Sequence, residues 1–239
     1  MPLILAVDTS ATPVSCALVR DGRVLALNYA HTGLTHSQTL MPMVEHMLRM
    51  ASVTAEQVDA MAVNAGPGSF TGVRIGVSAV KGLAFAHEKP CISVSTLAAM
   101  AENAAVLSGC AICCAMDARC QQVYTALFEK NEAGETVRLT EDEAVSIEEL
   151  GERLRALHKP ILLTGDGSNV CFEQLAGTIP HLYQAPPSAR YQNAAATAVL
   201  AERLFLANET VSAEALLPVY LRLPQAEREL RLRQEQAGE

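Results

Sequence analysis

The chain lacks a long apolar run and an excess of basic residues, and both absences limit what it can do. Of its 239 residues 50% are hydrophobic, yet no uninterrupted apolar run reaches the roughly 18 residues that suggest a membrane-spanning helix. The chain starts directly with a strand pattern, without the basic region of a signal peptide. Its 26 acidic residues outnumber its 18 lysines and arginines and give a net charge of −8, which argues against an extended nucleic-acid surface of its own. We therefore expect a cytoplasmic, globular protein without a membrane role.

The common sequence motifs of catalysis are also absent. The chain contains no H-E-x-x-H, no G-x-S-x-G, no Walker sequence and no G-x-G-x-x-G. Its seven cysteines include one C-x-x-C pair, Cys110 and Cys113, but no second pair follows at zinc-ribbon spacing. We interpret the cysteines near this pair as buried, reduced residues of a strand, and we expect no metal site.

The central feature is the stretch 64–86, which begins with the residues NAGPGSFTG. The apolar run 60–63 predicts a strand, the sequence GPGS at 66–69 predicts a tight turn, and the pattern that follows predicts a helix with Thr71 as its N-cap. Gly66 and Gly68 permit backbone conformations that a side chain would block, and amides at such a helix start can hold an anion. The turn is also consistent with a purely structural role, so both interpretations stay open.

The chain opens with a second candidate for anion binding. The apolar strand 3–7 ends in Asp8-Thr9-Ser10, and the runs 14–19 and 24–29 form a hairpin around the turn Asp21-Gly22. An acidic, hydroxyl-bearing turn after the first strand resembles the phosphate-binding start of actin, hexokinase and Hsp70. The alternative is that Asp8 satisfies the amides of its own turn. Five residues are therefore candidates for a vestigial nucleotide or phosphate site: Asp8, Thr9, Ser10, Gly66 and Gly68.

Two predicted helices carry patterns that suit either a core or an interface. In 36–50 the apolar residues recur at helical spacing and are rich in methionine, which fills cores and also suits adaptable interfaces. In 71–86, Gly72 and Gly76 lie four residues apart, and helical glycines need a packing reason. The neighbour that packs there is either the same domain or another chain.

The remaining pattern repeats the order of the first half. Elements are predicted at 91–94 (strand), 95–107 (helix), 111–116, 122–128 and 136–145 (strands), 147–157 (helix), 161–164 (strand) and 193–206 (helix). The turn Gly165-Asp166-Gly167 follows the last of these strands. Strands, helix, strand and helix thus occur twice, which predicts two related α/β domains, 1–107 and 108–214. We expect 215–239 to pack back on the first domain, with a charged surface helix from Pro224.

Several strings along the chain together resemble the bacterial TsaB family, also called YeaZ. They are ILAVDTS, THSQTLMPMV, GPGSFTGVRIGVSAVKGLA, VSTLAAMA, MDAR and PVYLR, in this order. The resemblance is closest over the first 120 residues and loose between Asn131 and Ser212. It implies two related ribonuclease H-like domains of the actin and Hsp70 type, each a mixed sheet flanked by helices.

The resemblance also implies a function. In this family setting a complex transfers a threonylcarbamoyl group from threonylcarbamoyl-adenylate to N6 of adenosine 37 in tRNAs that read ANN codons. TsaB is the non-catalytic scaffold, which pairs with its catalytic paralogue TsaD and the ATPase TsaE. ATP or ADP and a metal would belong to those partners, and tRNA would meet this chain only through the complex. TsaD carries a metal-binding His-x-x-x-His, and the corresponding segment here, 95–100, has no histidine. We therefore expect no catalytic residue and no transfer to tRNA by the chain alone.

The family pairs through a bundle of two helices from each partner, which correspond to 36–50 and 71–86 here. The same face would make a homodimer when the paralogue is absent. Nine residues are predicted to bind the partner: Leu40, Met43, Val44, Met47, Gly72, Gly76, Ala79, Val80 and Leu83. Two other classes stay open. One is a glycoprotease-like hydrolase, and the other is an actin-type ATP-binding enzyme whose cleft is flanked by Asp8, the Gly66 turn and the turn Gly165-Asp166-Gly167.

Overall fold

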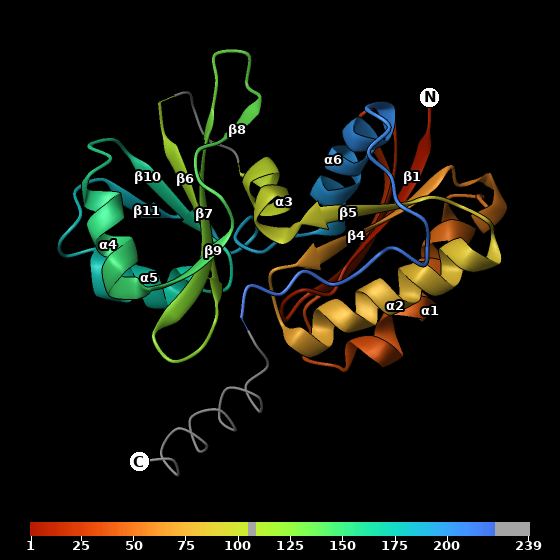
Figure 1. Ribbon diagram of the computed structural model, residues 1–239, viewed down its shortest axis with the longest axis horizontal. Coiled ribbons are helices and arrows are strands. Elements are labelled where there is room, and N and C mark those ends of the chain that lie inside the picture. Colours follow the sequence, from red (N-terminus) through yellow and green to blue (C-terminus); the bar gives the residue numbers. More distant parts are fainter. Residues whose placement is uncertain (105–108, 223–239) are drawn as a thin grey trace, which may run out of the picture.

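The computed structural model describes residues 1–104 and 109–222, and they form two sheets with helices around them (Figure 1). The predicted helix from Pro224 and the end of the predicted helix 95–107 lie outside the described residues. The elements are β1 (Leu3–Asp8), β2 (Val14–Arg20), β3 (Arg23–Ala30), α1 (His36–Met50), a 3-10 turn (Ala55–Gln57), β4 (Ala60–Gly66), α2 (Phe70–Ala86), β5 (Cys91–Ser95), α3 (Thr96–Asn103), β6 (Ala111–Asp117), β7 (Gln122–Lys130), β8 (Thr136–Arg138), β9 (Glu143–Ser146), α4 (Ile147–Arg155), β10 (Ile161–Thr164), α5 (Ser168–Leu175), β11 (Leu182–Gln184) and α6 (Ala194–Leu206).

The first sheet has the order β3-β2-β1-β4-β5, with β1 antiparallel to β2 and parallel to β4. Every residue of β1 and β4 is buried, because α1 and α2 cover one face of the sheet and α6 covers the other (Figure 1). Alternate β1 residues divide between the faces: Leu3, Leu5 and Val7 meet α1 and α2, whereas Ile4 and Ala6 meet α6. A central strand that is covered on both faces has a continuous apolar sequence, as residues 3–7 have.

The second sheet has the order β11-β10-β6-β7-β8, and β9 also pairs with β7. Helices α4 and α5 pack on one of its faces through Leu150, Leu154, Cys171 and Leu175. Helix α3 lies between the two sheets (Figure 1), where Leu97 and Met100 join a core cluster with residues of β6 and β7. Two α/β units of mixed strand direction, each flanked by helices, confirm the ribonuclease H-like fold that the resemblance implied.

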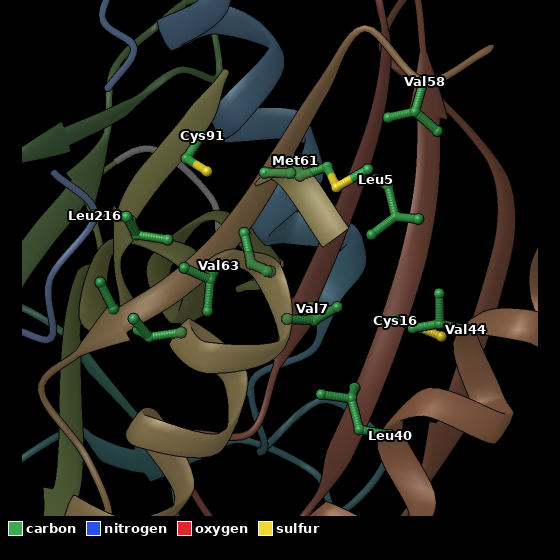
Figure 2. Packing of buried hydrophobic residues seen from close by; sticks show 14 of the residues in the cluster. Leu5, Val7, Cys16, Leu40, Val44, Val58, Met61, Val63, Cys91 and Leu216 are labelled. Atoms are coloured by element: carbon green, nitrogen blue, oxygen red, sulfur yellow. The ribbon is translucent and has the colours of Figure 1, made fainter. Parts of the chain in front are cut away.

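The predicted domain boundary differs from the packing in one element. Helix α6 was expected in the second domain, 108–214, but its alanine-rich face packs on β1, β2 and β4 of the first sheet. Sequence order alone could not show that the chain goes back to the first sheet at α6, because Ala194, Ala198 and Ala201 fit any closely packed sheet. The described part of the predicted returning segment, 215–222, does pack on the first unit, with Leu216 in its core (Figure 2).

Two local predictions also need correction. Ser69, not Thr71, caps α2, because the Ser69 hydroxyl accepts a hydrogen bond from the Gly72 amide at 3.2 Å. The single strand expected at 136–145 is two short strands, β8 and β9, which pair with opposite ends of β7.

Candidate functional site

A cleft of about 490 Å³ lies between the two units. Its walls come from the turn after β1 (Ser10 to Thr12), the turn before α2 (Pro67 to Ser69), the end of β6 with the residues after it (Met116 to Arg119), Asp166, and the segment Val219 to Arg222. The three turns that the sequence marked as possible flanks of one cleft do converge on it. Asp8 itself lies beneath the surface and does not line the cleft.

The polar residues of the turn after β1 are buried and make their hydrogen bonds within the chain. Asp8, Thr9 and Ser10 are 2%, 0% and 0% exposed. Asp8 Oδ1 accepts hydrogen bonds from the Ser10 amide (2.8 Å) and the Ser10 hydroxyl (2.6 Å), and burial raises the pKa of the carboxyl against these bonds. The Thr9 hydroxyl donates to the Gly72 carbonyl at 2.7 Å. Asp8 Oδ1 therefore bonds the amide of its own turn, which was the alternative to phosphate binding, whereas the buried Oδ2 has no hydrogen-bond partner among the described residues.

The glycines of the central stretch also meet backbone atoms of this chain. A Cβ on Gly68 would overlap the carbonyl oxygen of Ser10, and one on Gly72 would overlap that of Thr9. Gly66 has a φ of +132°, and a Cβ there would overlap the carbonyl oxygen of Val219. The Ser69 amide, at the start of α2, donates to the Ser10 carbonyl at 2.7 Å. The first turn of the chain and the segment at 219 therefore occupy the space beside these glycines.

On the opposite wall of the cleft two carboxyl groups lie close together. The Asp117 amide donates to Asp166 Oδ1 at 3.3 Å, and Arg119 pairs with Asp117 at 3.0 Å. Burial raises the pKa of Asp166 from 3.8 to about 6, although the amides of Asp117 and Gly167 oppose the rise. Among the residues described, no three His, Cys, Asp or Glu side chains are placed to hold a metal ion.

Asparagine in place of Asp166 is expected to stabilise the protein at pH 8 but not at pH 4. The folded-state pKa lies above the unfolded value, so the ionised carboxyl lowers stability above about pH 6, and the penalty disappears as pH falls toward 4. Two pKa units correspond to about 3 kcal/mol, and partial exposure reduces this to the order of 1–2 kcal/mol. Urea unfolding at pH 4, 6 and 8 measures the difference. The exposed carboxyl Glu148, changed to glutamine, is the control, and a benefit of Asp166→Asn that is the same at all three pH values would contradict the prediction.

The outer faces of α1 and α2 form an apolar groove next to the cleft. It is lined by Ser37, Leu40, Met41, Phe70, Thr71, Arg74, Ile75, Ser78 and Ala79. Phe70 and Thr71 line the cleft as well. Exposed apolar surface of this kind marks sites where proteins meet partners.

Only part of the predicted partner-binding set faces outward. Leu40, Val44, Met47 and Val80 are at most 1% exposed and belong to the core of the first unit, and Leu40 and Val44 point toward the sheet beside Val7 and Cys16 (Figure 2). Gly72 and Gly76 are buried against Thr9. Partly exposed positions are Met43, Ala79 and Leu83. The apolar period of a helix is the same for a core face and a partner face, so the sequence pattern selected buried positions for six of nine residues, of which Leu40 also lines the groove.

Sequence reasoning missed three residues that meet at one end of the groove. The rings of Phe70 and Tyr220 stack with centroids 4.6 Å apart, and the Arg74 guanidinium lies 3.9 Å from the Phe70 centroid. Phe70 and Arg74 are four apart in α2 and therefore share a face, which was a usable signal. Tyr220 is 146 residues from Arg74, and no local pattern connects the two.

No helix in the described ranges, 1–104 and 109–222, is long and apolar enough to cross a bilayer.

A family model, related sequences and a solved structure were compared with the chain, and their results agree with one another. Residues 31–230 match the family model described as "TsaD: tRNA N6-adenosine threonylcarbamoyltransferase". The tRNA threonylcarbamoyladenosine biosynthesis protein TsaB of Escherichia coli K12 is 33% identical over 92% of this chain and 94% of its own length. The protein of the same name from Bacillus subtilis 168 is 33% identical over 94% of this chain and 96% of its own. The solved structure of YeaZ from Pseudomonas aeruginosa is 32% identical, with a TM-score of 0.75 over 92% of this chain and all of the other.

Proposed function

Because the chain belongs to the TsaB family of tRNA threonylcarbamoyladenosine biosynthesis proteins, we propose that it serves that modification as a non-catalytic subunit paired with a TsaD-type transferase. The product is N6-threonylcarbamoyladenosine at position 37 of ANN-decoding tRNAs, and a TsaE-type ATPase completes the complex. The observation that carries the proposal is the apolar groove between α1 and α2, beside a cleft in which the hydroxyls of Thr9 and Ser10, after β1, donate their hydrogen bonds within the chain.

The hydrogen bonds of the turns after β1 and before α2 support a role as a scaffold rather than as a phosphate-binding enzyme. An actin-type phosphate site needs amides and hydroxyls that are free to meet the ligand. Here the Ser69 amide and the Thr9 hydroxyl are bonded within the chain. The buried thiols are poor nucleophiles for a hydrolase, since burial raises the pKa of Cys113 to about 12.

The groove supports pairing through α1 and α2. Met41 is 41% exposed, and Ile75 and Ala79 are partly exposed beside it. A helix pair of a partner laid over this groove would cover these side chains. We propose that the TsaD-type partner occupies the groove in the complex, and that a second copy of the chain occupies it when the partner is absent.

Reconstitution with purified components tests the proposal. Threonylcarbamoyl-adenylate and tRNA are incubated with this chain alone, with TsaD and TsaE alone, and with all three proteins, and modified adenosine is quantified by mass spectrometry. We expect no product from this chain alone and product from the full set that depends on this chain. Product from this chain alone would refute the non-catalytic role.

The cleft favours one second candidate, an ATP-binding enzyme of the actin type, because three turns line it. Titration calorimetry of the isolated chain with ATP and Mg²⁺ separates the two candidates. Weak or absent binding is expected for the scaffold. Tight binding that is lost in Asp166→Asn would instead support the enzyme.

A further inference from the structure

Arg74 is held in a defined position on the outer face of α2. Its guanidinium carbon lies 3.9 Å from the centroid of the Phe70 ring and 5.7 Å from that of Tyr220. Its Nε donates a hydrogen bond to the Tyr220 hydroxyl at 2.8 Å. Phe70 and Tyr220 stack on each other, so three side chains from two segments restrain one another. Stacking and one bond through Nε fix the plane of the guanidinium, while its two terminal nitrogens make no hydrogen bond to another described residue.

This fixed cation has no acidic partner in the described part of the chain. No carboxylate oxygen of the described residues lies within 4.0 Å of Arg74. Arg74 is exposed, yet it lines a groove whose other members include Leu40, Met41, Ile75 and Ala79. Any protein that covers the groove also removes water from the guanidinium, and a buried charge without a partner opposes binding strongly.

We propose that the protein partner in this groove presents a carboxylate to Arg74, and that this ion pair selects the partner over a second copy of the chain. The proposal rests on the proposed pairing through α1 and α2 and adds to it the chemical feature that determines its specificity. A planar guanidinium whose two terminal nitrogens are unbonded within residues 1–104 and 109–222 matches a carboxylate by two parallel hydrogen bonds.

A second copy of the chain meets this requirement poorly. Helix α2 carries Arg74 and Lys81 and no acidic residue, and α1 offers only Glu45. Two copies related by a two-fold axis through α2 would bring like charges toward each other, which disfavours that contact. Lys81 is already used within the chain, because its ammonium donates to the carbonyls of Glu214 and Leu216 at 3.0 Å.

A protein carboxylate suits the site better than a phosphate of RNA. Polyanion sites collect several cations along a surface. Arg74 is the one cationic side chain among the nine residues that line the groove, and the chain as a whole has a net charge of −8. An apolar groove with a single fixed guanidinium is typical of the anchor positions of protein interfaces, where arginine is enriched.

Charge exchange tests the proposal. The variants Arg74→Gln and Arg74→Glu are titrated against the purified TsaD-type partner, with Arg155→Glu as the matched control, because Arg155 is exposed on α4 of the second unit. We expect affinity to fall roughly 30-fold for Arg74→Gln and further for Arg74→Glu, and to stay unchanged for Arg155→Glu. One acidic residue of the partner, changed to lysine, is expected to restore binding of Arg74→Glu. Self-association of Arg74→Glu, measured by sedimentation, is expected to change less than about threefold, since α1 and α2 of a second copy carry only one acidic residue, Glu45, to meet Arg74.

The outcomes separate this inference from the function on which it rests. If both Arg74 variants bind the partner normally while Ala79→Glu does not, the groove is the interface and the ion pair is wrong. If all three bind normally, the pairing surface itself is wrong. If Arg74→Glu loses tRNA binding and keeps the partner, the anion is a phosphate and the proposal is overturned. Arg74→Gln adds no new charge, so it covers the case in which Arg74→Glu fails to fold.

Discussion

Alanine in place of Gly72 is expected to lower the free energy of unfolding by about 2–3 kcal/mol, although alanine is the better helix former by ~1 kcal/mol. The new Cβ would overlap the carbonyl oxygen of Thr9, which is a backbone atom in a fully buried turn. That turn is fixed on its other side by the bond from the Thr9 hydroxyl to the Gly72 carbonyl. Neither the turn nor α2 can move without breaking this contact, so the overlap cannot be relieved by a rotamer change.

Gly82 provides the matched control in the same helix. It is exposed, and a Cβ there would have no heavy atom within 4 Å. Gly82→Ala is therefore expected to raise the free energy of unfolding by about 0.5–1 kcal/mol through helix propensity alone. Chemical denaturation of the two variants measures both effects. Equal stabilisation by both alanines would show that the contact between α2 and the Thr9 turn is not tight.

Gly72 and Gly82 also show how much of the packing of α2 could be predicted from the sequence. The small-residue spacing in 71–86 predicted close approach on two helix faces, but left open whether the neighbour was internal or a second chain. For Gly72 and Gly76 the neighbour is the turn after β1, some sixty residues earlier in the chain. Local spacing carries no information about which distant segment fills a gap.

The helices and strands themselves could be predicted from local sequence patterns. Continuous apolar runs at 3–7 and 60–63 predicted buried strands, and the structure confirms both as central strands of the first sheet. Asn193 was placed at the start of a predicted helix and caps α6, where its side chain accepts from the Ala195 amide at 3.0 Å. The packing of α6 on the first sheet could not be predicted in this way, because it depends on two crossings between the units.

The sequence could predict which segments form the candidate site, but not which faces of α1 and α2 line it. The sequence identified the two helices that line the apolar groove and the three turns that line the cleft. It could not tell which face of α1 and α2 is covered by the sheet, and it assigned buried Val80 and half-buried Ala79 to the same surface. The Phe70, Arg74 and Tyr220 cluster needed a contact between α2 and the end of the described chain.

Glutamate at position 79 is expected to reduce affinity for the TsaD-type partner by a factor of a hundred or more while the chain stays folded. Ala79 is half-buried on the outer side of α2 and lines the groove, so in the isolated chain a longer side chain can extend into water. Under a bound partner the same carboxylate would be buried without a partner charge, which opposes binding by several kcal/mol. If the partner presents a carboxylate to Arg74, the new glutamate would also repel that group.

Two further variants decide where the effect of Ala79→Glu arises. Ala86 is an exposed alanine of the same helix and does not line the groove, so Ala86→Glu is expected to bind normally. Val80 is 0% exposed in the core of the first unit, and Val80→Glu is expected to unfold that unit, because a charge would be buried among apolar side chains. Sedimentation measures both pairings, and circular dichroism confirms the fold. Normal pairing of a folded Ala79→Glu chain would place the interface elsewhere, since no partner can cover this groove and leave position 79 in water.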